Sequence, residues 1–194
     1  MINKMINMNL TELYYWDLKF TIVPKELINL KILDCWRSPV DSIPKELINL
    51  TYLHAGYSKI QLIPKELINL TSLSIEGTNI QSIPKELINL VCLNCNNTKI
   101  KEIPKELINL TELDCSGTNI DHIPCELINL NDLCYDGFKK EEILKRQKRI
   151  KNGFIKFIKL YKYYKLFNTL WKIAEYYTAK KYSPDNILNY VDLD

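Results

Sequence analysis

Glycine, histidine and long apolar runs are all scarce in this 194-residue chain. Its five glycines are too few for the glycine-rich loops that bind phosphates or for flexible linkers. The two histidines, His54 and His122, do not have the spacing of metal ligands. No run of 18 or more apolar residues is present, so we expect no membrane-spanning helix. The N-terminal MINKMINMNL also lacks the apolar core of a secretory signal, and we therefore expect an intracellular, cytoplasmic protein.

The composition is that of a folded protein whose two parts differ in charge. Hydrophobic residues make up 46% of the chain and charged residues 25%, which argues against an intrinsically disordered protein. Residues 1–138 carry 12 Lys or Arg and 17 Asp or Glu, a net charge of −5, whereas residues 139–194 carry 14 and 6, a net charge of +8. We expect an acidic body followed by a basic segment.

One seven-residue block recurs with a constant period of 20 residues. The block reads Pro-Lys-Glu-Leu-Ile-Asn-Leu, and its sixth copy, at Pro124, has Cys125 in place of lysine. The five identical copies begin at Pro24, Pro44, Pro64, Pro84 and Pro104. Such a repeat predicts a solenoid, because one short unit cannot bury its own leucines whereas a stack of units forms a continuous core.

The residues between the blocks predict a short strand in each unit. Leu73 and Ile75 alternate with Ser72 and Ser74, a period of two that is typical of a strand with one buried face. The frame Leu-x-x-Leu-x-(Cys/Ile/Ala/Tyr)-x-x-(Thr/Ser)-x-(Ile/Val) resembles the leucine-rich repeat pattern. The resemblance implies an α/β repeat solenoid, an arc with a parallel β-sheet on its concave face. Six full units begin at residue 10 and a partial seventh at residue 130, so we assign the repeats to residues 1–138.

The chain departs from the leucine-rich repeat pattern in two ways. Threonine or serine, as at Thr78 and Thr98, replaces the asparagine that forms a buried ladder in the family, and we expect a hydroxyl ladder instead. The 20-residue unit also leaves no room for a long outer helix. Residues 85–89 are therefore predicted to return as a short helical or 3₁₀ turn on a flat, irregular outer face.

The residues that vary between units are predicted to point from the sheet to the concave side, where repeat proteins usually bind partners. Aromatic residues lie at the N-terminal end of this surface and acidic residues at the other end. Exposed Trp and Tyr are frequent in binding hot spots, so the aromatic end is the predicted partner-binding site. Its residues are Tyr14, Trp16, Trp36, Tyr52, His54 and Tyr57. The alternative is that these rings cap the N-terminal edge of the solenoid. The acidic end would suit a basic partner, or would simply keep the solenoid soluble.

We predict reduced cysteines without a metal site or a catalytic role. Cys92 and Cys95 form a CxxC, but the repeat register directs Cys92 outward and Cys95 into the core, so the two cannot share a zinc ion. Cys35, Cys95 and Cys115 occupy one inward position and are predicted core residues. Cys134 begins a Cys-x-Asp triplet like that of bacterial effector ubiquitin ligases, but too few residues follow it for such a catalytic domain. We therefore expect no enzyme and no cofactor.

After residue 138 the period stops, and residues 139–181 show helical spacing of apolar residues between lysines. We expect a first helix over residues 141–152, separated by Gly153 from a second. The favoured prediction for residues 139–194 is a helical cap over the last repeat, because solenoid ends expose their cores. The alternative is an adaptor whose basic helices bind an anionic membrane or nucleic acid.

The Ile-Pro-x-Glu-Leu repeat and the Leu-Trp-Lys-Ile-Ala-Glu-Tyr-Tyr…Tyr-Ser-Pro segment are similar to leucine-rich repeat proteins encoded by giant DNA viruses. The resemblance implies a role in engaging host or viral proteins in the cytoplasm of an infected host cell. We predict a monomeric interaction module that binds a protein partner of unknown identity and no small-molecule substrate.

Overall fold

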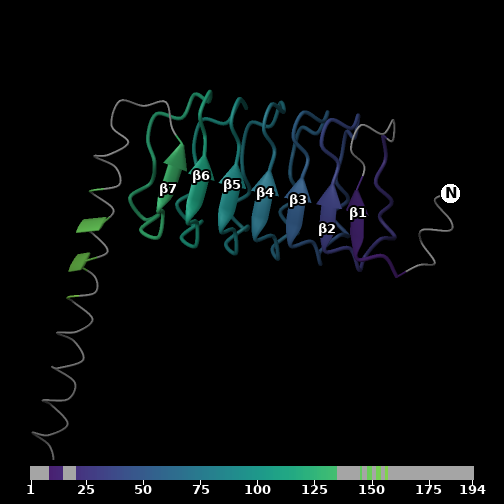
Figure 1. The fold of residues 1–194 in the computed structure, drawn as a ribbon, viewed down its shortest axis with the longest axis horizontal. Helices are drawn as coiled ribbons and strands as arrows, with labels where there is room; N and C mark the ends of the chain where they lie inside the picture. Colours follow the sequence, from purple (N-terminus) through teal and green to yellow (C-terminus); the bar gives the residue numbers. More distant parts are fainter. Residues whose placement is uncertain are drawn as a thin grey trace, which may run out of the picture. The chain divides into compact units, whose positions relative to one another are not determined.

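Seven short strands form one parallel sheet in which sequence neighbours lie side by side (Figure 1). The computed structural model describes residues 9–14 and 21–134, together with six helical positions between residues 145 and 156. The strands are β1 (Glu12–Tyr14), β2 (Ile32–Asp34), β3 (Tyr52–His54), β4 (Ser72–Ser74), β5 (Cys92–Asn94), β6 (Glu112–Asp114) and β7 (Asp132–Cys134). This order confirms the predicted solenoid with a parallel sheet.

The register of the sheet follows the 20-residue period of the sequence. Leu53 of β3 pairs with Leu33 of β2 and with Leu73 of β4, and the same offset holds at every step from β1 to β7. Each central leucine points inward and is buried, whereas the strand residues on either side of it are half-buried or exposed. The alternation predicted from Leu73 and its serine neighbours is confirmed.

One continuous hydrophobic core runs the length of the stack. Around β4, Leu67, Leu70, Ile75 and Ile80 are all fully buried, and the equivalent positions 20 residues before and after them are buried as well. Burial of each such side chain contributes about 1.5–3 kcal/mol relative to exposure. The core therefore belongs to the stack, because each unit supplies only one layer of it.

The inward cysteines belong to this core, as predicted. Cys35, Cys95 and Cys115 are buried, while Cys92 lies half-buried on the other side of its strand. Burial raises the pKa of the Cys35 thiol to about 12, with a smaller contribution from the negative charge of Asp34. This thiol is therefore protonated at neutral pH and behaves as a small apolar side chain.

The repeated block forms two consecutive turns on the outer side of each unit. In the block that begins at Pro64, the amide of Leu67 donates to the carbonyl of Pro64 at 3.2 Å. The amide of Leu70 donates to the carbonyl of Leu67 at 3.1 Å. The same pair of bonds recurs in all six blocks. The bonds join residues three apart, as in the predicted 3₁₀ turn, but the predicted irregular face was wrong, because the same two separate turns repeat in every unit.

The asparagine of the block links neighbouring units. Asn69 donates from its side-chain amide to the backbone carbonyl of Ile48 in the preceding unit, at 2.9 Å. The same bond recurs at Asn49, Asn89, Asn109 and Asn129. The chain therefore has an asparagine ladder, but on the outer turns instead of at the usual leucine-rich repeat position.

The predicted ladder of Thr78 and its equivalents is wrong. Thr78 donates to the carbonyl of Ile75 at 2.7 Å, and Thr98 donates to that of Cys95, so each hydroxyl closes a turn within its own unit. Hydroxyl bonds between units occur instead at the residue before the strand, as from Thr71 to the carbonyl of Thr51. A hydroxyl is shorter than an asparagine amide and bonds the carbonyl three residues before it.

The chain divides into two compact units, residues 1–150 and 151–194. In the second unit, Asn152, Gly153 and Lys156 are helical. The predicted break at Gly153 is therefore not present, and the rest of the predicted helical cap lies outside the described residues. Among the described residues, no helix is both long enough and apolar enough to cross a bilayer.

Candidate binding surface on the strand face

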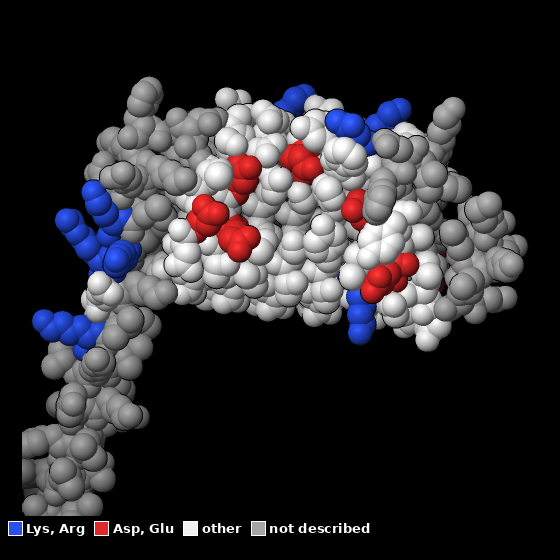
Figure 2. All heavy atoms as spheres, viewed as in Figure 1, with Lys and Arg blue, Asp and Glu red and all other residues white. Residues whose placement is uncertain are grey.

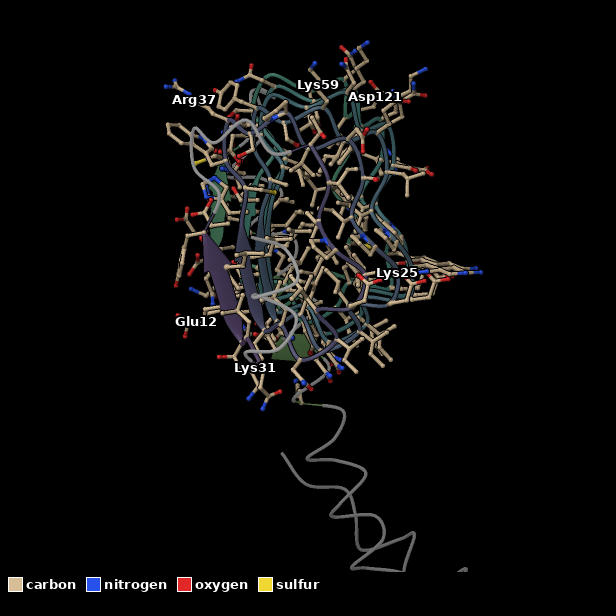
Figure 3. All side chains as sticks on the ribbon, turned by 90° about the vertical axis from the view of Figure 1, so that its right-hand side faces the viewer. Glu12, Lys25, Lys31, Arg37, Lys59 and Asp121 are labelled. Atoms are coloured by element: carbon tan, nitrogen blue, oxygen red, sulfur yellow. The ribbon has the colours of Figure 1, made fainter. Side chains whose placement is uncertain are left out.

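The outward side of the sheet is a continuous surface, here called the strand face. It consists of the first and third residues of each strand and the residues two and three positions after β2–β6. Figure 3 views the stack edge-on, with Glu12 on the strand face and Lys25 on the opposite side, among the outer turns. The residues that differ most between units are therefore displayed together, away from the identical blocks.

The strand face carries acidic residues and, among its described positions, Arg37 is its only Lys or Arg. Figure 2 shows Asp and Glu over the strands and the described Lys and Arg toward the margins of the view. The acidic positions are Glu12, Asp34, Glu76, Glu112, Asp114 and Asp132. Carboxylates thus occur at both ends of the face, and the predicted division into an aromatic end and an acidic end holds only in part.

Most of the predicted site residues lie at the β1–β3 end of the strand face. Tyr14, Tyr52 and Tyr57 are exposed, by 48%, 37% and 51%. Trp36 is half-buried, with its ring centroid 6.3 Å from that of His54. Trp16, the remaining predicted residue, lies outside the described residues.

An arginine that the sequence analysis missed completes this cluster. The guanidinium carbon of Arg37 lies 4.3 Å from the ring centroid of Trp36 and 5.8 Å from that of Tyr57. At such distances a cation is attracted to the negative face of an aromatic ring. We call Trp36, Arg37 and Tyr57 the arginine–aromatic cluster.

The arginine–aromatic cluster depends on an uncommon backbone conformation. Arg37 and Tyr57 have positive φ angles of 53° and 55°, and the equivalent residues of later units are Gly77, Asn97 and Gly117. Glycine and asparagine adopt this left-handed region readily, whereas other residues incur a cost of roughly 1–2 kcal/mol. A bulky residue at this repeat position was a readable signal in the sequence, and it points to Arg37 as well as Tyr57.

His54 lies between two carboxylates from neighbouring units. Its Nδ1 is 3.4 Å from Oδ2 of Asp34, and its Nε2 is 3.0 Å from Oε1 of Glu76. Ser74 donates its hydroxyl to the other carboxylate oxygen of Glu76 at 2.6 Å. The Glu76 side chain fits because it lies over Gly56, where a Cβ atom would collide with the carboxylate.

These contacts favour the charged forms of His54 and Glu76. The hydrogen bond to Glu76 raises the pKa of His54; desolvation opposes this rise, and the charge of Asp34 adds to it. Burial acts to raise the pKa of Glu76, but the hydrogen bonds from His54 and Ser74 outweigh it and lower that pKa. Both ring nitrogens of His54 face carboxylates, so neither offers a free lone pair to a substrate as a general base.

The His54 contacts predict a specific pH dependence of stability. Because the pKa of His54 is raised in the folded state, its contribution is complete below pH 6.5 and is lost as pH rises through the raised value. The lowered pKa of Glu76 gives a contribution that is present above pH 4.5 and is lost on acidification. We expect the free energy of unfolding, measured by urea denaturation, to fall as the pH rises from 6.5 through the raised pKa of His54.

The two histidines of the chain provide a matched control for this pH dependence. His54→Gln is expected to flatten the decline, while His122→Gln, at an exposed position on an outer turn, leaves it unchanged. An equal decline in wild type and His54→Gln would contradict the charged contact with Glu76.

The β5–β7 end of the strand face contains a second set of oriented carboxylates. Asp114 accepts hydrogen bonds from the Asn96 side chain at 3.0 Å and from the Ser116 hydroxyl at 2.6 Å. Burial acts to raise the pKa of Asp114, but these bonds outweigh it and lower the pKa. Glu112 accepts a bond from the Cys92 thiol at 3.2 Å. No group of three or more His, Cys, Asp and Glu residues in the described part of the chain has the arrangement of a metal site.

A shallow groove of about 290 Å³ runs along the strand face toward this end. Its lining includes Tyr52, Ser72, Cys92, Asn94, Glu112 and Asp132. The groove thus extends from an exposed aromatic ring on β3 to the carboxylates of β6 and β7.

A comparison with protein families identifies the repeat. The sequence pattern of the Leucine Rich Repeat family matches residues 109–130, about one unit of the stack. The fold is that of a leucine-rich repeat protein. Folds of this kind are typically binding scaffolds without catalytic activity, and their concave surfaces bind partners. No curated protein matches the sequence.

Solved structures contain the same leucine-rich repeat fold. A leucine-rich repeat protein of Leptospira interrogans is 27% identical, with a TM-score of 0.63, over 74% of this chain and 43% of that chain. An internalin of Listeria monocytogenes is 20% identical, with a TM-score of 0.65, over 75% of this chain and 49% of that one. The structure of PEPR1-AtPEP1 is 25% identical, with a TM-score of 0.55, over 64% and 21%. In each case the match spans less than half of the solved chain.

Proposed function

We propose that this chain is a non-enzymatic interaction module that binds a protein partner on the strand face. The observation that carries the proposal is the contrast between the two sides of the stack. The outer turns repeat the same block, whereas the strand face presents different side chains in each unit, with exposed rings at Tyr52 and Tyr57. Exposed aromatic residues contribute large contact areas at low entropic cost and are frequent in binding hot spots.

The position of the two tyrosines favours binding over capping. Both belong to the third unit, whose strand β3 is flanked by β2 and β4. They therefore cannot cover the open N-terminal edge of the core. Tyr14, on the first strand, is the only one of the three exposed tyrosines at that edge.

The backbone cost at Arg37 and Tyr57 also supports a functional role. Glycine at either position would remove the cost of the left-handed conformation, as it does at Gly77 and Gly117. Unfavourable backbone conformations concentrate at functional sites, where the side chain that they position is needed.

The test is affinity capture with the full chain and with a variant in which two residues are replaced by those at the equivalent positions of the next unit. Tyr52→Ser/Tyr57→Gly places the residues found at Ser72 and Gly77 at the equivalent positions of the third unit. We expect recovery of the specific partner to fall at least about tenfold, as for the loss of hot-spot residues. We also expect the free energy of unfolding to change by less than about 1 kcal/mol, because relief of the left-handed tyrosine offsets the lost ring contacts.

A control variant removes an equally exposed apolar side chain from the other side. Ile68→Ala lies on the outer turns, where Ile68 is 48% exposed. Partners recovered equally with wild type and Tyr52→Ser/Tyr57→Gly, or lost equally with Ile68→Ala, would exclude the strand face as the binding surface. The similarity to giant-virus proteins and the intracellular location stay predictions.

A further inference from the structure

We propose that the partner binds the strand face through a basic segment, rich in Arg and Lys, that lies along the groove from Tyr52 to Asp132. The inference rests on the proposed function and adds the chemistry of the partner. It is carried by the charge of the face, the placement of its carboxylates, the groove between them and the aromatic rings at its end.

Two carboxylates at the β6–β7 end of the face lack basic partners among the described residues. The ion pairs there join His54 to Asp34 and Glu76, while Glu112 and Asp132 have no Lys or Arg within ion-pair distance in the described part of the chain. Charges that are not neutralised within the protein remain available to a ligand. A face with six carboxylates repels phosphate-bearing ligands and attracts basic ones.

Two of these carboxylates are held side by side by the sheet. Glu112 of β6 and Asp132 of β7 are in-register partners, so two acidic residues are neighbours across adjacent parallel strands, while the Glu112 carboxylate accepts its hydrogen bond from Cys92 on the β5 side. Like-charged pairs in this position destabilise a sheet. A guanidinium or ammonium group bound between them would relieve that repulsion, and arginine is well suited because its planar fork can bond two carboxylate oxygens.

The dimensions of the strand face fit an extended peptide. Seven strands about 4.8 Å apart span about 29 Å from β1 to β7. An extended segment of about eight or nine residues has the same length. The groove covers the part of this span from β3 to β7, about 19 Å or six extended residues, and its lining includes both Glu112 and Asp132. A segment of about eight residues therefore fills the groove and extends beyond it.

The aromatic rings at the β2–β3 end of the face already contact a guanidinium of the same chain. Arg37 places its own guanidinium against the rings of Trp36 and Tyr57. Tyr52, at the start of the groove, presents a further ring that is 37% exposed. A basic segment in the groove thus meets an aromatic ring at one end and carboxylates at the other, two kinds of group that attract cations by independent mechanisms.

The test measures binding of a fluorescent oligo-arginine peptide of about eight residues to the full chain by anisotropy at low salt. We expect wild type to bind and Glu112→Gln/Asp132→Asn to bind about tenfold more weakly, with a reduced dependence on salt. The control Glu26→Gln/Glu46→Gln removes the same charge from exposed positions on the outer turns. Binding within about twofold of wild type is expected for this control, because the lost charges lie on the opposite side.

Two results would overturn the proposal: no binding by wild type, or equal weakening in both double variants. If wild type fails to bind the peptide but capture still depends on Tyr52 and Tyr57, the proposed function stands and only the basic chemistry is excluded. Sedimentation of the full chain without peptide distinguishes the source of the segment. Self-association that Glu112→Gln/Asp132→Asn abolishes would assign the face to residues 139–194 of a second copy, in place of a separate partner.

Discussion

Leu70→Ala is expected to lower the free energy of unfolding by about 3–4 kcal/mol. Leu70 is fully buried in the middle of the stack, between the equivalent leucines Leu50 and Leu90. The backbone ladders and the asparagine bonds hold the neighbouring units at a fixed spacing, so the units cannot move together to fill the cavity. The loss therefore combines the missing apolar contact with the cost of an unfilled space.

Urea denaturation followed by far-ultraviolet circular dichroism measures this change. Leu62→Ala makes the same substitution eight residues earlier in the chain. Leu62 is 64% exposed, so its replacement should lower the free energy of unfolding by less than about 0.5 kcal/mol. Similar losses for Leu62→Ala and Leu70→Ala would contradict the assignment of the inward face. A loss at Leu70 below about 1 kcal/mol would show that the stack closes around the cavity.

Gly77→Ala is expected to cost about 2 kcal/mol, from two separate causes. Gly77 has a φ of +64°, which an alanine adopts only with strain. In addition, a Cβ atom at this position would approach the Tyr57 ring too closely. The neighbouring unit therefore depends on Gly77 for space as well as for backbone conformation.

A double-mutant cycle separates the two causes. In the Tyr57→Gly background the ring is absent, so Gly77→Ala should retain only the backbone cost of about 1 kcal/mol. The coupling between the two substitutions, measured by urea denaturation, should then be about 1 kcal/mol. Strict additivity would mean that the Tyr57 ring does not press on this position.

The period of the sequence determines more of this structure than its composition does. Because the interval is always 20 residues, Leu33, Leu53 and Leu73 must occupy equivalent places, and the alternation around them identifies the inward face. The burial of Cys95 and the outward position of Cys92 follow from the same register. Residues related by the period could therefore be placed from the sequence.

Contacts that depend on side-chain direction could not be predicted in this way. His54 reaches Glu76, which lies 22 residues away instead of 20, because Gly56 leaves room for the carboxylate. The period places His54 beside Asp34 and Ser74, and it gives no reason for the diagonal contact. The reach of an asparagine is similarly invisible in the period, which is why the ladder from Asn69 to the carbonyl of Ile48 was not predicted.

The asparagine ladder makes the joints between units interchangeable. Each contact between units uses the same amide-to-carbonyl bond and the same leucines. A chain without residues 61–80 would therefore join Ile60 to Gln81 and form the same asparagine bond and leucine contacts between the units on either side. Removal of residues 81–100 in the same way would bring the arginine–aromatic cluster about 4.8 Å closer to Glu112 and would keep Gly77, which leaves room for the Tyr57 ring. The number of units thus sets the length of the strand face. The gain or loss of one unit by recombination would change the length of the segment that the face accommodates, while the residues at its two ends stay the same.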